Sequence, residues 1–237
     1  MSSSINLKLF STHPHPCSYL DDQEATTVFV DPEAPMTPAL YSRLSDLGFR
    51  RSGQHVYRPQ CAECSACLPV RVRLQDFKPN RTQKRTLKRN RDLQLELVDS
   101  IDTDECYALY ARYIAERHQD GDMYPPSRSQ YQGFLTTEWG ITRFLVARAD
   151  GKLVGVAVCD QLEQGLSAVY TFFDPALSAR SLGSWFILQQ IHWANRLGLP
   201  YLYLGYWIRD CQKMNYKTQY QPLECFRAGF WARLSAN

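Results

Sequence analysis

The order of the hydrophobic patterns after Asp102 is the feature that most limits how this chain can fold. Two stretches with apolar residues at helical spacing come first, the second of them after Ser127. Two apolar runs joined at Asp150–Gly151 predict a β-hairpin, and a third strand is expected after Gly165. A helix is predicted over 181–197, followed by the strand YLYLGYW. The predicted order is therefore α-α-β-β-β-α-β.

The residues before this region predict a smaller module. Five prolines interrupt the first 40 residues, and one helix-like stretch runs from Pro38 to Leu47. A strand-like HVYRP, a cysteine cluster, a basic segment and the alternating LQLELV follow, and LQLELV is expected to form a half-buried strand. We place a domain boundary near residue 100, with an N-terminal module at 1–100 and a second domain at 101–237.

The order of elements in the second domain resembles the GNAT acyltransferase arrangement, so the predicted class is α+β: a small N-terminal cysteine-containing module followed by a GNAT-like acyltransferase domain. In GNAT proteins a loop of the form R-x-x-G-x-G/A presents backbone N–H groups to a cofactor pyrophosphate at a helix N-terminus. Arg180 and Gly183 fit this loop, but Trp185 stands at its last position. Acetyl-CoA is therefore not the expected donor. The alternative is a solvated Arg180, a turn at Gly183 and a core Trp185.

Positive charge is concentrated in one segment. The net charge is +3, yet residues 71 to 91 hold nine cations against Asp76 alone. Such a segment favours a polyanion, and an acyl group carried on RNA would reconcile it with the altered loop. The alternative is a solvated helix face with no partner. The candidate tRNA-binding residues are Arg81, Lys84, Arg85, Lys88 and Arg89.

Composition and the N-terminal sequence indicate in which compartment the protein is expected. The chain has 237 residues, of which 44% are hydrophobic, and no run of about 18 apolar residues occurs. The N-terminal MSSSINLKLF has neither a basic nor an apolar signal region. We expect a cytoplasmic protein with no membrane or DNA partner, whose eight cysteines stay reduced or bind a metal.

Several long motifs carry a resemblance to a known family. YRPQCAECSACLPVRV, RTQKRTLKRNRDL, RHQDGDMYPPS, GLSAVYTFFDP, RSLGSWFILQQI and LPYLYLGYWIRDCQKMNYKTQYQPLE are similar to the bacterial aspartate/glutamate leucyltransferases, relatives of the eukaryotic arginyl-tRNA–protein transferases. The resemblance implies transfer of leucine from leucyl-tRNA to the α-amine of proteins beginning with Asp or Glu, which marks them for degradation by the N-degron route. It also implies a GNAT-type domain that works without coenzyme A, so that aminoacyl-tRNA is a co-substrate and no cofactor is required.

Polar residues crowd the end of the strand YLYLGYW. The leucyl ester is already activated, so the reaction needs positioning, a neutral amine and oxyanion stabilisation more than a strong base. We assign Tyr206 or Asp210 to proton handling, and Lys213 or Lys217 to the acceptor carboxylate or the tRNA end. The alternative acceptor residues are Arg71 and Arg73. Tyr206 in the core and the charges on the surface would be the purely structural outcome; Tyr170 and Asp174 are second-rank catalytic candidates.

Four cysteines are candidate ligands for zinc or an iron–sulfur cluster. Cys61, Cys64 and Cys67 form a CxxCxxC, and Cys17 is a fourth soft ligand. Eukaryotic relatives carry another Cys at the position of Leu20, so the ligand set is altered here. We favour reduced structural or substrate-pocket thiols over a metal.

Two other functions stay open. A conventional acetyl-CoA-dependent N-acetyltransferase would need the pyrophosphate loop that Trp185 alters. A non-enzymatic zinc-dependent RNA-binding protein would not need the tyrosine- and lysine-rich motif after the last predicted strand.

Overall fold

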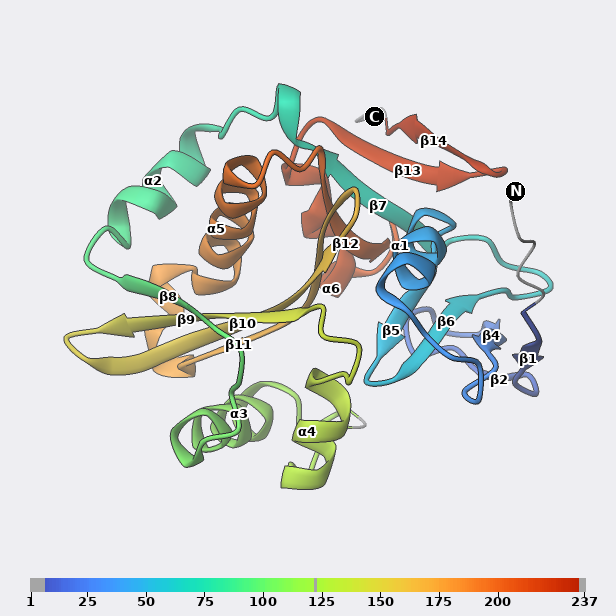
Figure 1. Ribbon diagram of the computed structural model, residues 1–237, viewed down its shortest axis with the longest axis horizontal. Helices are drawn as coiled ribbons and strands as arrows, with labels where there is room; N and C mark the ends of the chain where they lie inside the picture. The colour runs from blue at the N-terminus through green and yellow to red at the C-terminus, as the bar shows by residue number, and fades with distance from the viewer. Residues whose placement is uncertain (1–6, 122, 235–237) are drawn as a thin grey trace.

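The computed structural model describes residues 7–121 and 123–234 (Figure 1). The first six residues of MSSSINLKLF, which entered the expectation about export, lie outside this part. Within the described residues, no helix is both long and apolar enough to span a bilayer. The chain forms a small N-terminal sheet with one helix, and a large sheet with helices on both faces. The expected α+β class is confirmed.

The small sheet is antiparallel and comes from the first 60 residues. Its strand order is β1-β4-β6-β5, and a separate two-stranded ribbon pairs β2 with β3. The strands are β1 (Leu9–Ser11), β2 (His15–Pro16), β3 (Glu24–Ala25), β4 (Thr27–Val30), β5 (Arg50–Ser52) and β6 (His55–Pro59).

Helix α1 (Pro38–Asp46) links β4 to β5, which confirms the helix predicted there. The Thr37 hydroxyl accepts a hydrogen bond from the Leu40 N–H at 3.2 Å, and proline in the first turn loses no helical hydrogen bond. Tyr41 is fully buried, and the inner face of α1 packs with β4 and β6 in a small core.

The large sheet has eight strands in the order β14-β13-β7-β12-β11-β10-β9-β8. It takes strands from both sides of residue 100, so the division into 1–100 and 101–237 stays a prediction. The strands are β7 (Leu68–Arg73), β8 (Gln94–Val98), β9 (Thr142–Ala149), β10 (Lys152–Leu162), β11 (Gly165–Phe173), β12 (Tyr201–Trp207), β13 (Leu223–Arg227) and β14 (Phe230–Arg233).

Helices cover both faces of the large sheet. In Figure 1, α2 (Arg81–Arg89) and α5 (Leu182–Arg196) lie on one face, and α3 (Asp104–Arg117) and α4 (Arg128–Leu135) on the other. Each face has its own apolar core. The short helices are η1 (Leu74–Asp76), η2 (Pro175–Arg180), α6 (Gln212–Asn215) and η3 (Tyr216–Gln219).

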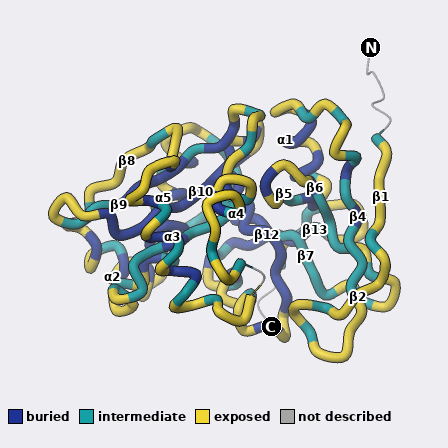
Figure 2. Tube along the Cα trace, turned by 90° about the horizontal axis from the view of Figure 1, so that it is seen from below, coloured by how far each residue is buried: buried dark blue, intermediate teal, exposed yellow. Residues whose placement is uncertain are grey.

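The predicted order α-α-β-β-β-α-β is confirmed by α3, α4, β9, β10, β11, α5 and β12. The hairpin turn has Asp150 at φ +47° and Gly151 at φ +78°, as a two-residue turn between antiparallel strands requires. The expectation for LQLELV was only half right. The segment is strand β8, but Leu95 and Leu97 are 39% and 50% exposed because β8 is the edge strand, and Figure 2 shows it exposed where β10 and β12 are buried.

One junction interrupts the regular pairing of the large sheet. Strands β11 and β12 are parallel, and they pair only where Gly165–Ser167 meets Tyr201–Tyr203. Beyond Ser167, β11 continues beside β10, and beyond Tyr203, β12 continues beside β7. The backbone edges that face each other past this point, here called the strand junction, are therefore free to meet side chains from other elements.

Candidate functional site

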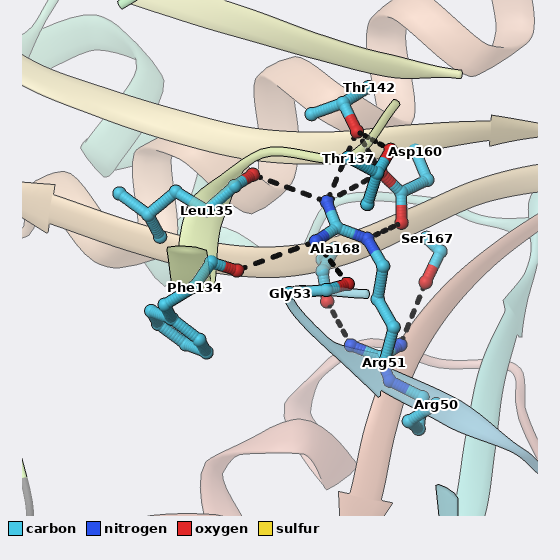
Figure 3. A network of polar contacts seen from close by, with 10 residues as sticks. All are labelled: Arg50, Arg51, Gly53, Phe134, Leu135, Thr137, Thr142, Asp160, Ser167 and Ala168. Carbon is cyan, nitrogen blue, oxygen red and sulfur yellow. Dashed lines mark hydrogen bonds and ion pairs between the residues drawn. The ribbon is translucent and has the colours of Figure 1, made fainter. Parts of the chain in front are cut away.

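Arg50 of β5 reaches from the small sheet into the strand junction (Figure 3). Its Nη1 donates to the Ser167 hydroxyl at 2.9 Å, and its Nη2 donates to the Ala168 carbonyl. On the β12 side, a Cβ at Gly205 would lie 3.3 Å from the Arg50 Cζ, and Gly205 has φ +77°. The guanidinium is thus held between the two diverging strands. Sequence reasoning did not find Arg50, because no local pattern links it to a partner 117 residues away.

Two tyrosines, Tyr57 and Tyr206, lie within the electrostatic influence of Arg50. The rings of Tyr57 and Tyr206 lie 6.3 Å apart, and burial raises the pKa of both hydroxyls while the charge of Arg50 opposes that rise. The Tyr206 hydroxyl donates to the Gly48 carbonyl at 2.9 Å, with the Tyr57 carbonyl as a second acceptor at 3.3 Å. Tyr206 therefore lies beside the strand junction, but its proton is engaged with the backbone.

Lys217 is buried close to the same arginine. It is 4% exposed, and its Nζ donates to the Tyr206 carbonyl and to the Met214 Sδ. Burial, and then the charge of Arg50, lower the pKa of this amine to about 7. Lys217, one of the expected acceptor-binding residues, thus lies near the strand junction, but its amine donates to Tyr206 and Met214 of the protein itself.

Asp210 and Lys213 lie on the surface after β12. Asp210 is exposed. Lys213 forms an exposed ion pair with Asp120 at 3.0 Å. Of these two residues, Asp210 is the one without an ion pair among the described residues, so its carboxylate is accessible to a ligand.

Arg71 and Arg73 of β7 differ in burial and in their ion-pair partners. Arg71 is buried, with ion pairs to Glu224 at 2.8 Å and Asp46 at 3.2 Å, and its guanidinium stacks over the Tyr201 ring at 3.5 Å. Arg73 pairs with Asp76 on the surface. Two carboxylates already neutralise Arg71, so its present role is to join β7, β13 and α1.

Helix α2 presents the expected basic surface. Asn80 forms a capping box with Gln83, and Gln83 and Thr86 face inward while the cations face solvent. The basic character is thus confined to the outward side of the helix. The exposed cations are Arg81, Lys84, Arg85, Lys88 and Arg89, of which Arg89 donates to the Ala179 carbonyl.

The residues of the altered pyrophosphate loop contact other parts of the protein. Arg180 donates from Nε to the Asn90 Oδ1 at 2.9 Å and pairs with Asp92, so it is not a free loop charge. Gly183 lies in the first turn of α5, which corrects the alternative of a turn residue. Trp185 is 3% exposed and belongs to the core, as the structural alternative expected.

The second-rank catalytic candidates, Tyr170 and Asp174, both make contacts that stabilise the fold. The Tyr170 ring packs edge-on against Phe134, with centroids 5.1 Å apart. The Asp174 carboxylate accepts a hydrogen bond from the Ala176 N–H at 3.0 Å and pairs with Arg112 at 3.0 Å. These contacts are those of a core tyrosine and a capping aspartate.

The four candidate metal ligands lie around one cavity. Cys17, Cys61, Cys64 and Cys67 line one cavity of about 40 Å³. Burial and the neighbouring thiols raise the pKa of Cys67 to about 12. Four thiols suit zinc chemically, yet in the part of the chain that the structure describes no three His, Cys, Asp or Glu side chains are arranged to share an ion. The arrangement as it stands does not fit a metal, and the choice between metal and reduced thiols stays a prediction.

The fold and the family comparisons together give the class of protein. The large sheet, with helix α5 packed against β11 and β12, has the order of elements that the sequence predicted for an acyltransferase domain, and Trp185, at the last position of the altered pyrophosphate loop, lies in the core. Two family models match the chain: "Arginine-tRNA-protein transferase, C terminus" over residues 105–227 and "Arginine-tRNA-protein transferase, N terminus" over residues 15–85. The chain belongs to the arginine-tRNA-protein transferase family and is an aminoacyltransferase.

Relatives that match over the whole chain narrow the similarity to one group within this family. "Aspartate/glutamate leucyltransferase" of Teredinibacter turnerae is 60% identical over 100% of this chain and 98% of its own. Proteins of the same name from Saccharophagus degradans and Alcanivorax borkumensis are 56% and 57% identical, over 98% and 99% of this chain and 98% and 97% of their own. The structure of L-PGS from Bacillus licheniformis covers 71% of this chain and 49% of its own at 13% identity, with a TM-score of 0.46. The resemblance seen in the sequence motifs is confirmed by these relatives.

Proposed function

We propose that this protein transfers leucine from leucyl-tRNA to the N-terminal α-amine of proteins that begin with Asp or Glu, and so marks them for N-degron-dependent degradation. The observation that carries the proposal is identity of 52–60% over nearly the whole chain with proteins named aspartate/glutamate leucyltransferase. Leucyl-tRNA is made in the cytoplasm, so we propose that the protein acts there.

The chemistry fits a site without a strong base. The α-amine nitrogen attacks the ester carbonyl carbon, a C–N bond forms, and the C–O bond to the terminal ribose breaks. The proton released by the amine ends on the departing ribose oxygen. An α-amine has a pKa of about 7.7 to 8.0, so a useful fraction is neutral near pH 7.5 without a dedicated base. The ester supplies the activation, and we propose that no further cofactor is required.

The strand junction is the proposed place of transfer. Backbone N–H groups of β11 and β12 that no longer pair with each other are the proposed oxyanion donors. Asp210, exposed directly after β12, is the better proton-handling candidate, because the Tyr206 proton is already donated to the Gly48 carbonyl. The outward cations of α2 are the proposed tRNA contacts.

Transfer assays test this function directly. Purified protein is incubated with leucyl-tRNA labelled in the leucine and with peptides that differ only in a first residue of Asp, Glu, Asn or Ala. Leucine should enter the Asp and Glu peptides in strong preference. Equal incorporation into all four peptides, or into none, contradicts the proposal. A parallel reaction with labelled acetyl-CoA should give no product, and acetylation would favour the conventional N-acetyltransferase instead.

A further inference from the structure

Arg50 and Arg51 are neighbours on β5, but within the described ranges only Arg51 forms an ion pair. Successive side chains of a strand point to opposite sides, and Figure 3 shows the two guanidinium groups diverging. Arg51 is fully buried, and Asp160 neutralises it. Arg50 belongs to none of the ion pairs among residues 7–121 and 123–234. A half-buried arginine without a carboxylate is costly to keep, so an anion from outside would stabilise it.

The Arg50 guanidinium is held ready for a ligand. Its contacts with Ser167 and Ala168 use two of the five N–H donors of an arginine, and the other three form no hydrogen bond to any residue that the structure describes. Gly205 leaves room for the flat group on the β12 side, where any Cβ would crowd it. An arginine that is already fixed loses little freedom on binding, and its planar fork matches a carboxylate.

The surroundings favour a small acidic group over a nucleic acid backbone. Tyr57, Tyr206 and the buried amine of Lys217 all lie close enough to Arg50 for its charge to lower their pKa values. In such a partly buried place an ionic hydrogen bond is stronger than on the surface. The exposed cations of α2, which suit phosphates, lie on the α5 face of the sheet, away from β5.

We propose that Arg50 binds the side-chain carboxylate of the first residue of the acceptor, and so sets the preference for Asp and Glu. The inference rests on the proposed leucyl transfer, and it names a residue outside the Lys213, Lys217, Arg71 and Arg73 set expected from the sequence. Arg71, Arg73 and Lys213 each form ion pairs with carboxylates. Lys217 directs its amine at the Tyr206 carbonyl and the Met214 Sδ. Arg50, in contrast, lies at the junction and forms no ion pair with the described part of the chain.

The test compares Asp- and Asn-initiated peptides, which have nearly the same shape and differ in charge. For Arg50→Met and Arg50→Gln, the ratio of kcat/KM for Asp over Asn should fall by about ten- to a hundredfold, since an ionic hydrogen bond is lost. Gln keeps a polar amide at this position but removes the charge. Arg50→Lys should recover part of the ratio, because it restores the charge without the fork. The Kd for leucyl-tRNA should not change.

The matched control is Arg43→Met, which removes an exposed arginine of α1 that forms no ion pair among the described residues. Its ratio should equal that of the unmodified protein. An unchanged Asp/Asn ratio in Arg50→Gln, even with a lower overall rate, would show that Arg50 only positions β11 and would overturn the inference. A weaker Kd for leucyl-tRNA would assign Arg50 to the RNA and overturn it as well. Loss of Asp preference in the unmodified protein would instead remove the proposed function.

Discussion

Arg51 and Asp160 form a bidentate ion pair that is wholly shielded from solvent, although 109 residues separate them in the chain. The Arg51 Nε lies 2.6 Å from the Asp160 Oδ2, and its Nη2 lies 2.8 Å from Oδ1. The Thr142 hydroxyl also donates to Asp160, and Arg51 reaches the Leu135 carbonyl (Figure 3). The pair therefore ties the small sheet to β10 and to the end of α4.

Breaking this pair should be costly. Asp160→Asn leaves a buried guanidinium without a counter-charge, and we expect the free energy of unfolding to fall by about 3 to 5 kcal/mol. Urea unfolding followed by circular dichroism measures it. The control is Arg148→Met, which breaks the more exposed Arg148–Glu105 pair and should cost less than about 1 kcal/mol. Equal losses in the two variants would show that the buried pair has no special weight.

Lys217 should make stability depend on pH. Its pKa is about 7 in the folded protein, below the ordinary 10.5, because of burial and the charge of Arg50. As the pH rises, the folded protein therefore releases this proton near pH 7, whereas the unfolded chain keeps it up to about pH 10.5. Below pH 7 the buried charged amine destabilises the folded state fully, and this destabilisation decreases between pH 7 and 10.5. The free energy of unfolding should rise with pH relative to Lys217→Met, by up to about 1.4 kcal/mol per pH unit.

Urea titrations of both proteins at intervals from pH 6 to 9 measure this difference. Lys213→Met is the control, since Lys213 is exposed. Parallel curves for the unmodified protein and Lys217→Met would mean that the buried amine keeps its ordinary pKa.

The outward cations of α2 should govern tRNA affinity. Replacing Lys84, Arg85 and Lys88 with Gln should weaken the Kd for leucyl-tRNA by about tenfold or more at low salt, and reduce the slope of log K against log salt by about 2 to 3. Folding should be kept because all three are exposed. Filter binding across a salt series measures both quantities.

A variant with the same loss of charge elsewhere gives the comparison. Arg43, Lys152 and Arg227 are exposed cations on other elements, and their replacement by Gln should leave the slope almost unchanged. Similar slopes for the two triple variants would move the tRNA site away from α2.

The cysteine cavity should contain less than one metal ion per chain. We expect protein purified without oxygen to show no stoichiometric zinc by elemental analysis and no cluster absorption. Under denaturing conditions, all eight cysteines should then react with a thiol reagent. One zinc per chain that disappears in Cys61→Ser/Cys64→Ser would reverse this expectation and make the four thiols a structural metal site.

Lys213 should contribute little to acceptor choice. Asp120 partly offsets its charge in a solvent-exposed pair, so Lys213→Met should change the Asp/Asn ratio of kcat/KM by less than about threefold. The peptide transfer assay checks this value. A tenfold fall would show that the Asp120 pair opens in the substrate complex and would return Lys213 to the acceptor site.

The local elements of this protein follow from its sequence. The apolar spacing of α3 and α5 and the Asp150–Gly151 turn depend on residues within a few positions of each other. Backbone geometry and side-chain periodicity act over that range, so the patterns predicted these elements and their order. The long motifs also identified the family, which the full-length relatives confirm.

Only the tertiary structure decided which charged side chains are buried and which have an ion-pair partner. In the sequence Arg50, Arg71 and Lys217 are simply three cations, but the fold gives Arg71 two carboxylates, buries Lys217, and holds Arg50 against Ser167 and Ala168 without a counter-ion. The state of a charge depends on its distance to partners and on its exposure to water. For Arg50 and for the Arg71–Glu224 pair, the partners lie 117 to 153 residues away in the chain, a separation that no local pattern records.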